Sequence, residues 1–494
     1  MLEEKTEDVV RDMAVQVRGC DGTNRSRIFY VDSEGGDDLN QGTCPEKPWR
    51  SIGRVNAAAF GPGDRVCFKR GGKWKGMLRP RGNGSRSSPV VITSYSGVES
   101  SDCAGSDGYY ENRTGEKPEI DGDGAYAAIL LDGVSFYVVE GIRAANRARD
   151  RRVRQGICVM GKAEGITEEI VIRGCEVLEV DGQNCRARDV YESMYWNGGI
   201  YVTMPGRSSR ANHLHHIQIC NNHIHDVFTS GIRINQEEDF INDIHHTCVV
   251  VRGNLIERTG SDGIIVANSI SPLIDGNRCY DAGALGTAGE TQFIAGIWVC
   301  AVSNALIQYN EVARTRLFRD DGTAFDTDWG NEGDTVFQYN YTHDNEGGFW
   351  LDCSSLNYNS GYGKTVLRYN VSLRDGRGIA VDDKGLPAEF CGNFFLFEKK
   401  AAVCVGNDGR DFTFTHNAFL MEEPPSDEWG NALYVENWYG EQRCPRDRDS
   451  LPGNSFESGE FLSGCPDSGG DGMKWLDDKW KQLHELVRKR SVRI

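Results

Sequence analysis

The sequence lacks the features of several large protein classes. It has no run of 18 consecutive apolar residues, which a membrane-spanning helix requires. Its 55 Lys and Arg are outnumbered by 73 Asp and Glu, and the net charge of −18 argues against a nucleic-acid partner and against binding to anionic membranes. A highly acidic glycan is disfavoured for the same reason, unless a local basic patch overrides the total charge.

Proline and paired cysteines are also scarce. There are 14 Pro against 59 Gly, so the excess of glycine indicates frequent tight turns and not disorder. The 16 cysteines form no CxxC pair and no Cys/His spacing suited to zinc, so we expect most of them to be small core residues. A disulfide framework is the alternative, with Cys444 and Cys465 as its best candidates.

The first residues, MLEEKTEDVVRDM, have neither the basic nor the apolar region of a signal peptide. We therefore expect a cytosolic protein, or else a secreted protein whose leader is absent from this sequence. The oligomeric state stays open.

The chain repeats between residues 120 and 420. Segments such as QYNEVARTRLFRDDGTAFD and QYNYTHDNEGGFWLD share one plan: an apolar strand, an Asn, a turn, a Gly and a second strand. No sustained helical period interrupts them. The repeated asparagines are spaced by 23 to 33 residues, at Asn222, Asn254, Asn277, Asn310, Asn340, Asn370, Asn393 and Asn417. This spacing predicts a parallel β-helix in which the stacked asparagines form a hydrogen-bonded ladder.

The expected fold is therefore all-β, a right-handed parallel β-helix over residues 28–420, the hand following the general rule for parallel crossovers. Residues 1–27 form an N-terminal extension, and the first coil carries an N-terminal cap. Residues 421–494 form a loop-rich C-terminal extension. Its last segment, KWLDDKWKQLHELVRKR, has an apolar stripe that predicts a terminal helix.

The segment from Ile28 to Phe419 resembles the right-handed β-helix enzymes of the pectate-lyase-like superfamily, which act on carbohydrates. The resemblance rests on YVDSEGGDDLNQGT, PWRSI, PGDRVCFKRGGKW, DGTAFDTDW and HDNEGGF. It implies a β-helix and a carbohydrate substrate. The GHG and RIK signatures of the β-helix polygalacturonases are absent, so that activity is not implied. The chain looks more like the β-helix xylosidases and fucosidases, whose catalytic groups are carboxylates.

The second strands suggest where the chemistry lies. When each is aligned on its Gly, from GICVM at 156 to AVCVG at 402, positions 2 and 4 are mostly apolar and face inward. The outward position 5 then carries Asp326, Asp352 and Asp382 in three successive coils. Adjacent parallel strands are about 4.8 Å apart, so such crowding should raise at least one carboxyl pKa. A protonated carboxyl beside an ionised one is the pair that glycoside hydrolysis uses.

Other residues of these strands and turns complete the expected site. Trp350 would stand beside the aspartates and offer its ring face to a sugar. Trp298 and Tyr201 would be further sugar platforms, and Arg233 and Arg377 would hold hydroxyls or a carboxylate. The remaining candidates lie in or next to the turns: Glu346 as an acid, and Asp328, His343 and Trp329 as substrate-binding residues.

The sequence thus predicts a glycoside hydrolase that cleaves plant or microbial poly- or oligosaccharides without a cofactor. We favour retention, with Asp326 or Asp352 as the nucleophile and Asp352, Asp382 or Glu346 as the general acid/base. Inversion stays open, because residues two coils apart approach the wider carboxyl spacing that it needs.

The alternative is a calcium-dependent polysaccharide lyase that acts on a uronate-containing glycan by β-elimination. Calcium would be held by the aspartates, and a basic side chain would remove the proton at C5. The residues for these roles are Asp326, Asp352, Asp382 and Asp383 for the ion and Lys384 or Arg377 as the base. A non-catalytic glycan-binding solenoid is a third possibility, and it predicts sugar binding without turnover.

Overall fold

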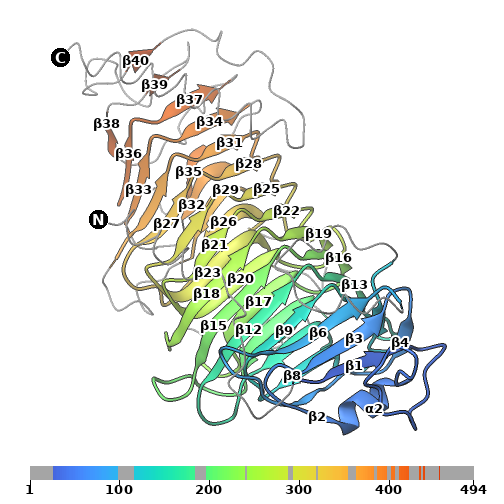
Figure 1. Cartoon of the computed structure of the whole chain (residues 1–494). Helices are drawn as coiled ribbons and strands as arrows, with labels where there is room; N and C mark the ends of the chain where they lie inside the picture. Colours follow the sequence, from blue (N-terminus) through green and yellow to red (C-terminus); the bar gives the residue numbers. More distant parts are fainter. Residues whose placement is uncertain are drawn as a thin grey trace.

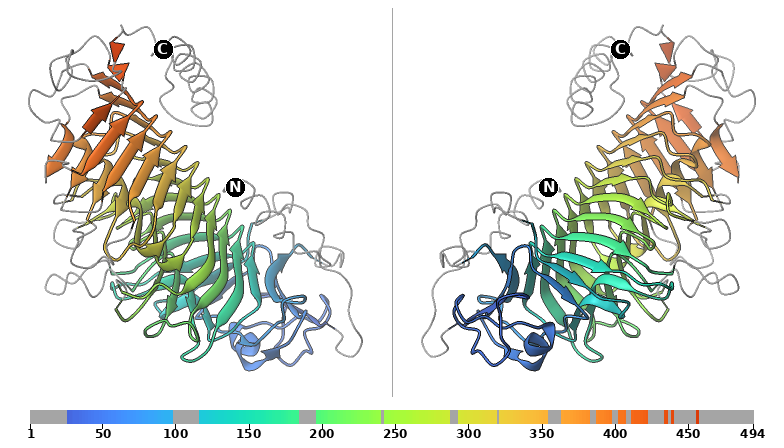
Figure 2. Two further views of the ribbon diagram at one scale, coloured as in Figure 1. Left: turned by 90° about the vertical axis from the view of Figure 1, so that its left-hand side faces the viewer. Right: turned by 90° about the vertical axis from the view of Figure 1, so that its right-hand side faces the viewer.

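A coil of three short strands repeats along the chain and builds a long parallel stack (Figure 1). The computed structural model describes residues 26–97, 116–183, 196–239, 242–286, 293–318, 321–353, 363–382, 387–397, 402–406, 411–421, 433–435, 438–439 and 455–456. Figure 2 shows the coils following one another in sequence order along one axis, from the blue N-terminal strands to the red ones. The predicted parallel β-helix is confirmed.

The three strands of a coil lie on three faces, in the order face 1, face 2, face 3. Face 1 holds β8 (Ala127–Asp132), β11 (Gln155–Met160), β14 (Ile200–Met204), β17 (Ile232–Gln236), β20 (Ile264–Ile270), β23 (Ala295–Ser303), β26 (Thr323–Thr327), β29 (Gly348–Asp352), β32 (Gly378–Asp382) and β35 (Ala402–Gly406). Face 2 holds β1 (Ile28–Val31), β3 (Arg65–Lys69), β6 (Val90–Tyr95), β9 (Tyr137–Glu140), β12 (Thr167–Arg173), β15 (Leu214–Cys220), β18 (His246–Arg252), β21 (Leu273–Asp275), β24 (Leu306–Gln308), β27 (Thr335–Gln338), β30 (Thr365–Arg368), β33 (Ala388–Cys391), β36 (Phe412–Thr415) and β38 (Leu433–Val435).

Face 3 is a separate sheet of 14 strands, whereas faces 1 and 2 join into one sheet of 24. Its strands are β4 (Lys73–Lys75), β7 (Glu119–Asp121), β10 (Arg143–Asn146), β13 (Glu176–Val180), β16 (His223–Val227), β19 (Leu255–Thr259), β22 (Arg278–Tyr280), β25 (Glu311–Ala313), β28 (Tyr341–His343), β31 (Val371–Leu373), β34 (Phe394–Phe397), β37 (Ala418–Met421), β39 (Trp438–Tyr439) and β40 (Ser455–Phe456). Because β38, β39 and β40 pair with strands of the preceding coils, parallel pairing continues past the boundary expected at residue 420. The rest of the C-terminal extension, with its expected helix and with Cys444 and Cys465, lies outside the described residues.

The first coil is closed by a short cap. Helix α2 (Ile52–Ala57) begins at Ser51, whose hydroxyl accepts a hydrogen bond from the backbone N–H of Arg54 at 3.1 Å. Ile52 and Val55 of this helix are buried in the common core. The strands β2 (Ala59–Phe60) and β5 (Arg81–Gly82) pair beside it. The structure thus has the predicted N-terminal cap. Within the described residues, no helix has the length and apolar character needed to cross a membrane.

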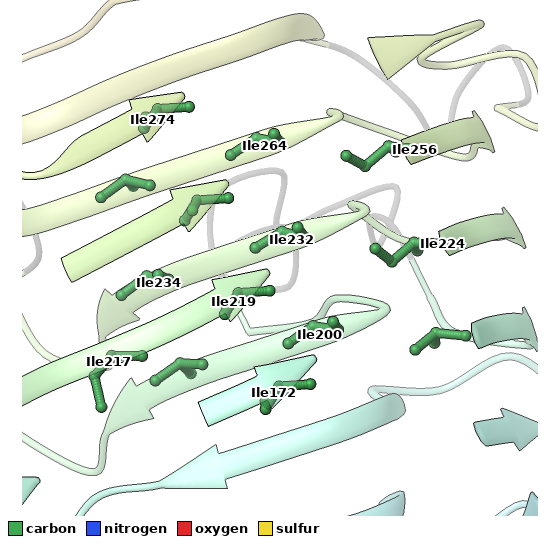
Figure 3. Close-up of a cluster of buried hydrophobic side chains, with 14 of the residues drawn as sticks. Ile172, Ile200, Ile217, Ile219, Ile224, Ile232, Ile234, Ile256, Ile264 and Ile274 are labelled. Atoms are coloured by element: carbon green, nitrogen blue, oxygen red, sulfur yellow. The ribbon is translucent and has the colours of Figure 1, made fainter. Parts of the chain in front are cut away.

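The interior of the stack is filled mainly by aliphatic side chains. Figure 3 shows isoleucines of all three faces lying one above another, and all of those that it labels are fully buried. β-Branched residues suit strands, and each large side chain buried contributes roughly 1.5 to 3 kcal/mol. The labelled residues are Ile172, Ile200, Ile217, Ile219, Ile224, Ile232, Ile234, Ile256, Ile264 and Ile274.

At the corner between faces 3 and 1, a small residue on one face is combined with a larger residue on the other. A Cβ added to Gly231 would lie 2.6 Å from Cγ2 of Ile256, and one added to Gly296 would lie 2.2 Å from Cγ1 of Val312. Glycine therefore leaves room for the face 3 side chain of the same coil. The coil of β29 reverses the sizes, because Phe349 takes the place of the glycine and face 3 of that coil carries Ser372. The strand of this coil therefore has no glycine at the corner position.

The asparagine ladder is present as predicted, from Asn222 to Asn417. From Asn222 to Asn393, each Nδ2 amide donates to Oδ1 of the Asn in the next coil at 2.9 to 3.0 Å. A second Nδ2–H bond, of 2.7 to 3.0 Å, goes to a backbone carbonyl of the preceding coil. All eight side chains are at most 2% exposed. Buried polar groups are thus satisfied between neighbouring coils.

Replacing one member tests the ladder. We expect Asn310→Leu to lower the free energy of unfolding by about 3 kcal/mol or more, because it leaves the carbonyl of Ile274 and two N–H donors of Asn277 buried without partners. The matched control is Asn304→Gly, an exposed Asn with a positive φ of 53°. Calorimetric melting should show a large fall for Asn310→Leu only. Equal melting temperatures for both variants would contradict a stabilising ladder.

Candidate active site

The predicted file of three aspartates does not form. Asp326 of β26 has Leu351 as its register partner in β29, and Asp352 pairs with Thr327 below it and Asp382 above it. The register of Asp326 is therefore shifted by one residue relative to Asp352 and Asp382. A slip of one residue moves a side chain to the opposite face of a strand, so the expectation that Asp326, Asp352 and Asp382 share one outward column is wrong.

The alignment failed because glycine does not mark the same place in every coil. Ala295 and Ile297 pair with Thr323 and Phe325, so the counterpart of Gly296 is Ala324 and not Gly322. Thr323 in turn pairs with Gly348, so the residue opposite Ala324 is Phe349, and Gly348 lies one position before it. In these two coils the glycine therefore lies where the turn meets the strand, one or two residues before the position of Gly296.

The shift places two expected site residues in the interior. Trp350 is fully buried and packs on Phe390 and Phe412, with ring centroids 5.7 Å apart in both pairs, so it is a core residue and not a sugar platform. Asp352 has the same parity and is fully buried, and its Oδ1 lies 3.3 Å from the hydroxyl of Thr327. Asp382 is the register partner of Asp352 in β32.

A different acidic cluster forms on the outer side of face 1. Asp326 and Asp328 are two residues apart on β26 and its exit, and Cys353 follows β29 in the next coil. One ligand atom of each of these three residues lies within 4.8 Å of those of the other two. Asp326 is 6% exposed, Asp328 is half-buried, and Oδ1 of Asp326 has no hydrogen-bond partner within the described part of the chain. Two carboxyl groups are thus held close together at the surface of the stack.

Burial dominates the electrostatics of this cluster. Loss of water raises the pKa of Asp326 well above its usual range, and the nearby charges of Asp328, Asp321, Asp352 and Asp262 raise it further. The pKa of Asp328 rises to about 7, mainly through burial and then through Asp262, while Arg233 opposes the rise. Both carboxyl groups of the cluster therefore have a raised pKa, and that of Asp328 places its titration near neutral pH.

The aromatic and basic residues near the cluster are buried. Trp298, the register partner of Asp326, is 4% exposed and donates its indole N–H to Asp262 Oδ1 at 2.8 Å. Asp262 also accepts from the hydroxyl of Ser261 at 2.7 Å. The fully buried Arg233 has its guanidinium carbon 5.9 Å from the Trp298 ring centroid. Arg233 and Trp298 thus lie under the acidic cluster instead of offering an open surface.

Three other expected residues lie elsewhere. Tyr201 is fully buried among Leu130, Cys158 and half-buried neighbours, so it is not an open platform. His343 is on face 3, where it contacts Glu311 and Asp344 at 3.5 and 2.7 Å. The carboxylate of Glu346 pairs with Arg316 at 2.8 Å and accepts from the N–H of Leu317. None of these contacts brings His343 or Glu346 into the acidic cluster.

The remaining expected residues are only placed along the chain. Trp329 is half-buried directly after Asp328, and its carbonyl accepts from the N–H of Ala301 at 2.8 Å. Arg377 is half-buried directly before β32. Asp383 and Lys384 lie outside the described residues. The substrate-binding roles of Trp329 and Arg377 stay predictions.

Sequence reasoning missed three residues of the site. Asp262 and Asp321 lie in turns that lead from face 3 into face 1, and Cys353 follows β29. Asp–Gly pairs are usual turn residues, so DDG and SDG gave no reason to separate these acids from any other turn. The usable signal is DTD at 326–328, because residues two apart on a strand share a face.

The cluster does not fit calcium. Calcium takes six to eight hard oxygen ligands, whereas the only set of three or more metal-ligating groups found in the described residues has two carboxylates and the Cys353 thiol. Burial and the neighbouring carboxylates raise the pKa of that thiol well above its usual range, so it stays protonated. Of the four expected calcium ligands, Asp326 and Asp352 do not converge, so the expected site is not assembled from them.

The pH dependence of stability tests the electrostatics. In the unfolded chain Asp328 ionises at its ordinary pKa, but when folded it holds its proton up to about 7. The folded state thus binds the proton more tightly, and stability falls as the pH rises between these two values. We expect Asp328→Asn to melt near the wild type at pH 4 and to be more stable at pH 7.5 by about 1 to 4 kcal/mol.

The control for this measurement is the exposed Asp334→Asn, which should follow the wild type at both pH values. A melting temperature of Asp328→Asn that stays below the wild type at pH 7.5 would show that the Asp328 carboxylate is stabilising, contrary to this expectation.

The chain is similar to lacto-N-biosidases. A lacto-N-biosidase of Bifidobacterium longum subsp. longum is 24% identical in an alignment of 503 residues, gaps counted, that covers 84% of this chain and 31% of that protein. The chain thus spans about a third of the length of this curated relative. The crystal structure of a GH136 lacto-N-biosidase from Eubacterium ramulus matches with a TM-score of 0.66 at 23% identity, covering 80% of this chain and 68% of that one.

A third likeness is more distant. The structure of XylC in complex with xylose matches with a TM-score of 0.50 at 12% identity, covering 90% of this chain and 88% of that one. No protein-family model matches the sequence. At these identities the structural matches establish the fold alone, and the chain shares the parallel β-helix of these carbohydrate-active enzymes, as the sequence resemblance implied.

Proposed function

We propose that the protein is a glycoside hydrolase whose catalytic groups are carboxylates of the cluster around Asp326 and Asp328. The observation that carries the proposal is the pair itself. The two carboxyl groups approach within 4.8 Å on the outer side of face 1, and burial raises the pKa of both. A pair of neighbouring carboxyl groups, one of them able to hold a proton near neutral pH, is what acid-assisted glycoside cleavage requires.

We assign the roles from the raised pKa values. Asp328 is partly ionised near neutral pH, so we assign it the nucleophilic role. The pKa of Asp326 is raised well above its usual range, which favours the protonated form that a general acid needs, and Asp321, whose charge raises the pKa of Asp326, is the alternative acid. Their spacing lies nearer the roughly 5 to 5.5 Å of retaining enzymes than the 6.5 to 9.5 Å of inverting ones, which supports retention.

The substrate we propose is an oligosaccharide. The support is the 24% identity over 84% of the chain to a protein named lacto-N-biosidase. Trp329, half-buried next to Asp328, is the aromatic side chain we assign to a sugar ring at this site. The lyase alternative has less support, because Asp326 and Asp352 do not converge on an ion.

Single substitutions test the pair. We expect Asp328→Asn to lower kcat by about 10²- to 10⁴-fold on a nitrophenyl glycoside of lacto-N-biose or on the best substrate of a nitrophenyl glycoside panel. Whichever of Asp326→Asn and Asp321→Asn gives a similar loss is the acid. Added azide should restore turnover differently in the two classes of variant, giving a glycosyl azide of inverted configuration for the nucleophile and of retained configuration for the acid/base.

The control is Asp334→Asn, which removes an exposed carboxylate of the same coil and should keep full activity. Full activity of Asp328→Asn, or a product that absorbs in the ultraviolet through a new double bond, would overturn the assignment as a carboxylate-pair hydrolase.

A further inference from the structure

Five arginines fall within eight residues, 147–154, of a chain whose net charge is −18. This segment, RARDRRVR, joins β10 on face 3 to β11 on face 1. This segment is thus a local concentration of positive charge in an otherwise acidic protein. The positions of its side chains decide whether these charges are neutralised within the fold or offered to a ligand.

An open cavity of about 570 Å³ lies at this segment. Its lining includes four of the arginines and two aspartates: Arg147, Arg149, Arg152, Arg154, Asp123 and Asp150. The size is within the range of small-molecule sites, roughly 300 to 1,000 Å³. The cavity is therefore large enough for one or two sugar units.

Arg154 fixes the shape of the cavity wall. It is 4% exposed, and its Nε and Nη1 donate to the carbonyls of Gly124 and Asp181 at 3.0 and 3.1 Å. Its Nη2 donates to Asp150 Oδ1 at 2.6 Å, and the other oxygen of Asp150 accepts from Arg152 at 2.5 Å. One carboxylate is thus shared by two guanidinium groups in a preformed wall, and the Asp181 carboxylate accepts from the N–H of Ala148 at 2.7 Å beside them.

The other arginines of the lining differ in their pairing. Arg147 pairs with Glu119 and Asp121, which are 8% and 7% exposed, and with the more exposed Glu179, so its charge is neutralised within the fold. Asp123 is paired with Lys75 at 2.9 Å. Arg149 is exposed and pairs with no carboxylate of the described residues. The cavity therefore presents Arg149 and the exposed Arg152 as guanidinium groups for a ligand.

We propose that this cavity binds an oxyanion carried by a carbohydrate, such as a carboxylate or sulfate ester on a sugar ring. Planar guanidinium groups recognise both anions through paired hydrogen bonds, and Asp123 and Asp150 can accept from neighbouring hydroxyls. The segment lies on the same edge of the coils as the turns that carry Asp262 and Asp321.

The cavity is separate from the acidic cluster. The face 1 strand β11 is five coils from β26, through β14, β17, β20 and β23. At about 4.8 Å a coil this is about 24 Å. The site would therefore hold an acidic sugar several units away from the bond that is cut, or a separate glycan chain. The inference goes beyond the proposed function and does not need it.

Binding is tested on the full chain carrying Asp328→Asn, so that turnover does not interfere. The probes are sialyllactose for the carboxylate, lactose 3′-sulfate for the sulfate ester, neutral lactose, and inorganic sulfate, each titrated by calorimetry in 50 mM salt. We expect at least one anionic sugar to bind more than 10-fold tighter than lactose and to weaken in 500 mM salt. Arg149→Ala and Arg152→Ala should each weaken that binding 5- to 20-fold.

The matched control is Arg86→Ala, which removes an exposed arginine that pairs with Glu168 and Glu169 in another part of the stack, and it should leave the affinity unchanged. Equal binding of lactose and both anionic sugars, or affinities unaffected by Arg149→Ala and Arg152→Ala, would overturn the proposal. Inorganic sulfate that binds as tightly as the sulfated sugar would overturn its carbohydrate part. Melting curves of the variants, which alter exposed side chains only, confirm that each is folded.

Discussion

Parallel pairing between coils decides, for every strand residue, whether its side chain lies in the apolar interior or on the outer surface. The asparagine ladder anchors this register, because each Asn is hydrogen-bonded to the coil on either side and is almost fully buried. A displaced coil would leave several such groups without partners at once, which costs far more than any single surface contact. The acidic cluster exists only because this register brings Asp326 and Asp328 outward on β26.

The repetitive part of the fold could be predicted from the sequence. The strands, the parallel stacking and the ladder depend on a periodic pattern and on one residue type at one turn, and both are visible along the chain. The site could not be predicted to the residue, because it depends on single-residue shifts between coils. Where Phe349 replaces the corner glycine, the pattern still shows a Gly nearby at 348, and only the paired strands show that it occupies another position.

The sequence also could not separate structural from functional acids. Asp375 and Asp326 are both buried and both have a raised pKa, with loss of water as the first cause. Asp375 accepts from the hydroxyls of Ser372 and Thr342 at 2.6 and 2.5 Å and from Asn345, so it is a saturated part of the fold. Oδ1 of Asp326 receives no such bond within the described residues. The difference lies in the hydrogen bonds, which come from residues of other coils.

Burying unsatisfied carboxyl groups lowers stability, so the acidic cluster is maintained by the rest of the stack. Loss of water disfavours the ionised forms of Asp326 and Asp328, which raises the pKa of both groups and lowers the free energy of unfolding at neutral pH. The stacked isoleucines and the ladder offset this cost over many coils. Strained electrostatics of this kind is typical of catalytic sites and uncommon in structural ones, which is why the cluster, and not the more exposed acids, carries the functional proposal.

Arginine is used in two ways along the edge between faces 3 and 1. In three places a guanidinium binds both oxygens of one aspartate in the preceding coil, at 2.7 to 3.0 Å: Arg258 on Asp226, Arg314 on Asp281 and Arg374 on Asp344. Arg147 pairs with Glu119 and Asp121 of the preceding coil and with Glu179 of the following one. The charges of these four arginines are neutralised within the fold and need no ligand.

The cavity arginines break the pattern, since Arg149 has no carboxylate of the described residues and Arg152 shares Asp150 with Arg154. An acidic chain has carboxylates available for such pairing, and the neighbouring coils use them. Unmatched guanidinium groups in a preformed cavity therefore point to an anion supplied from outside the protein.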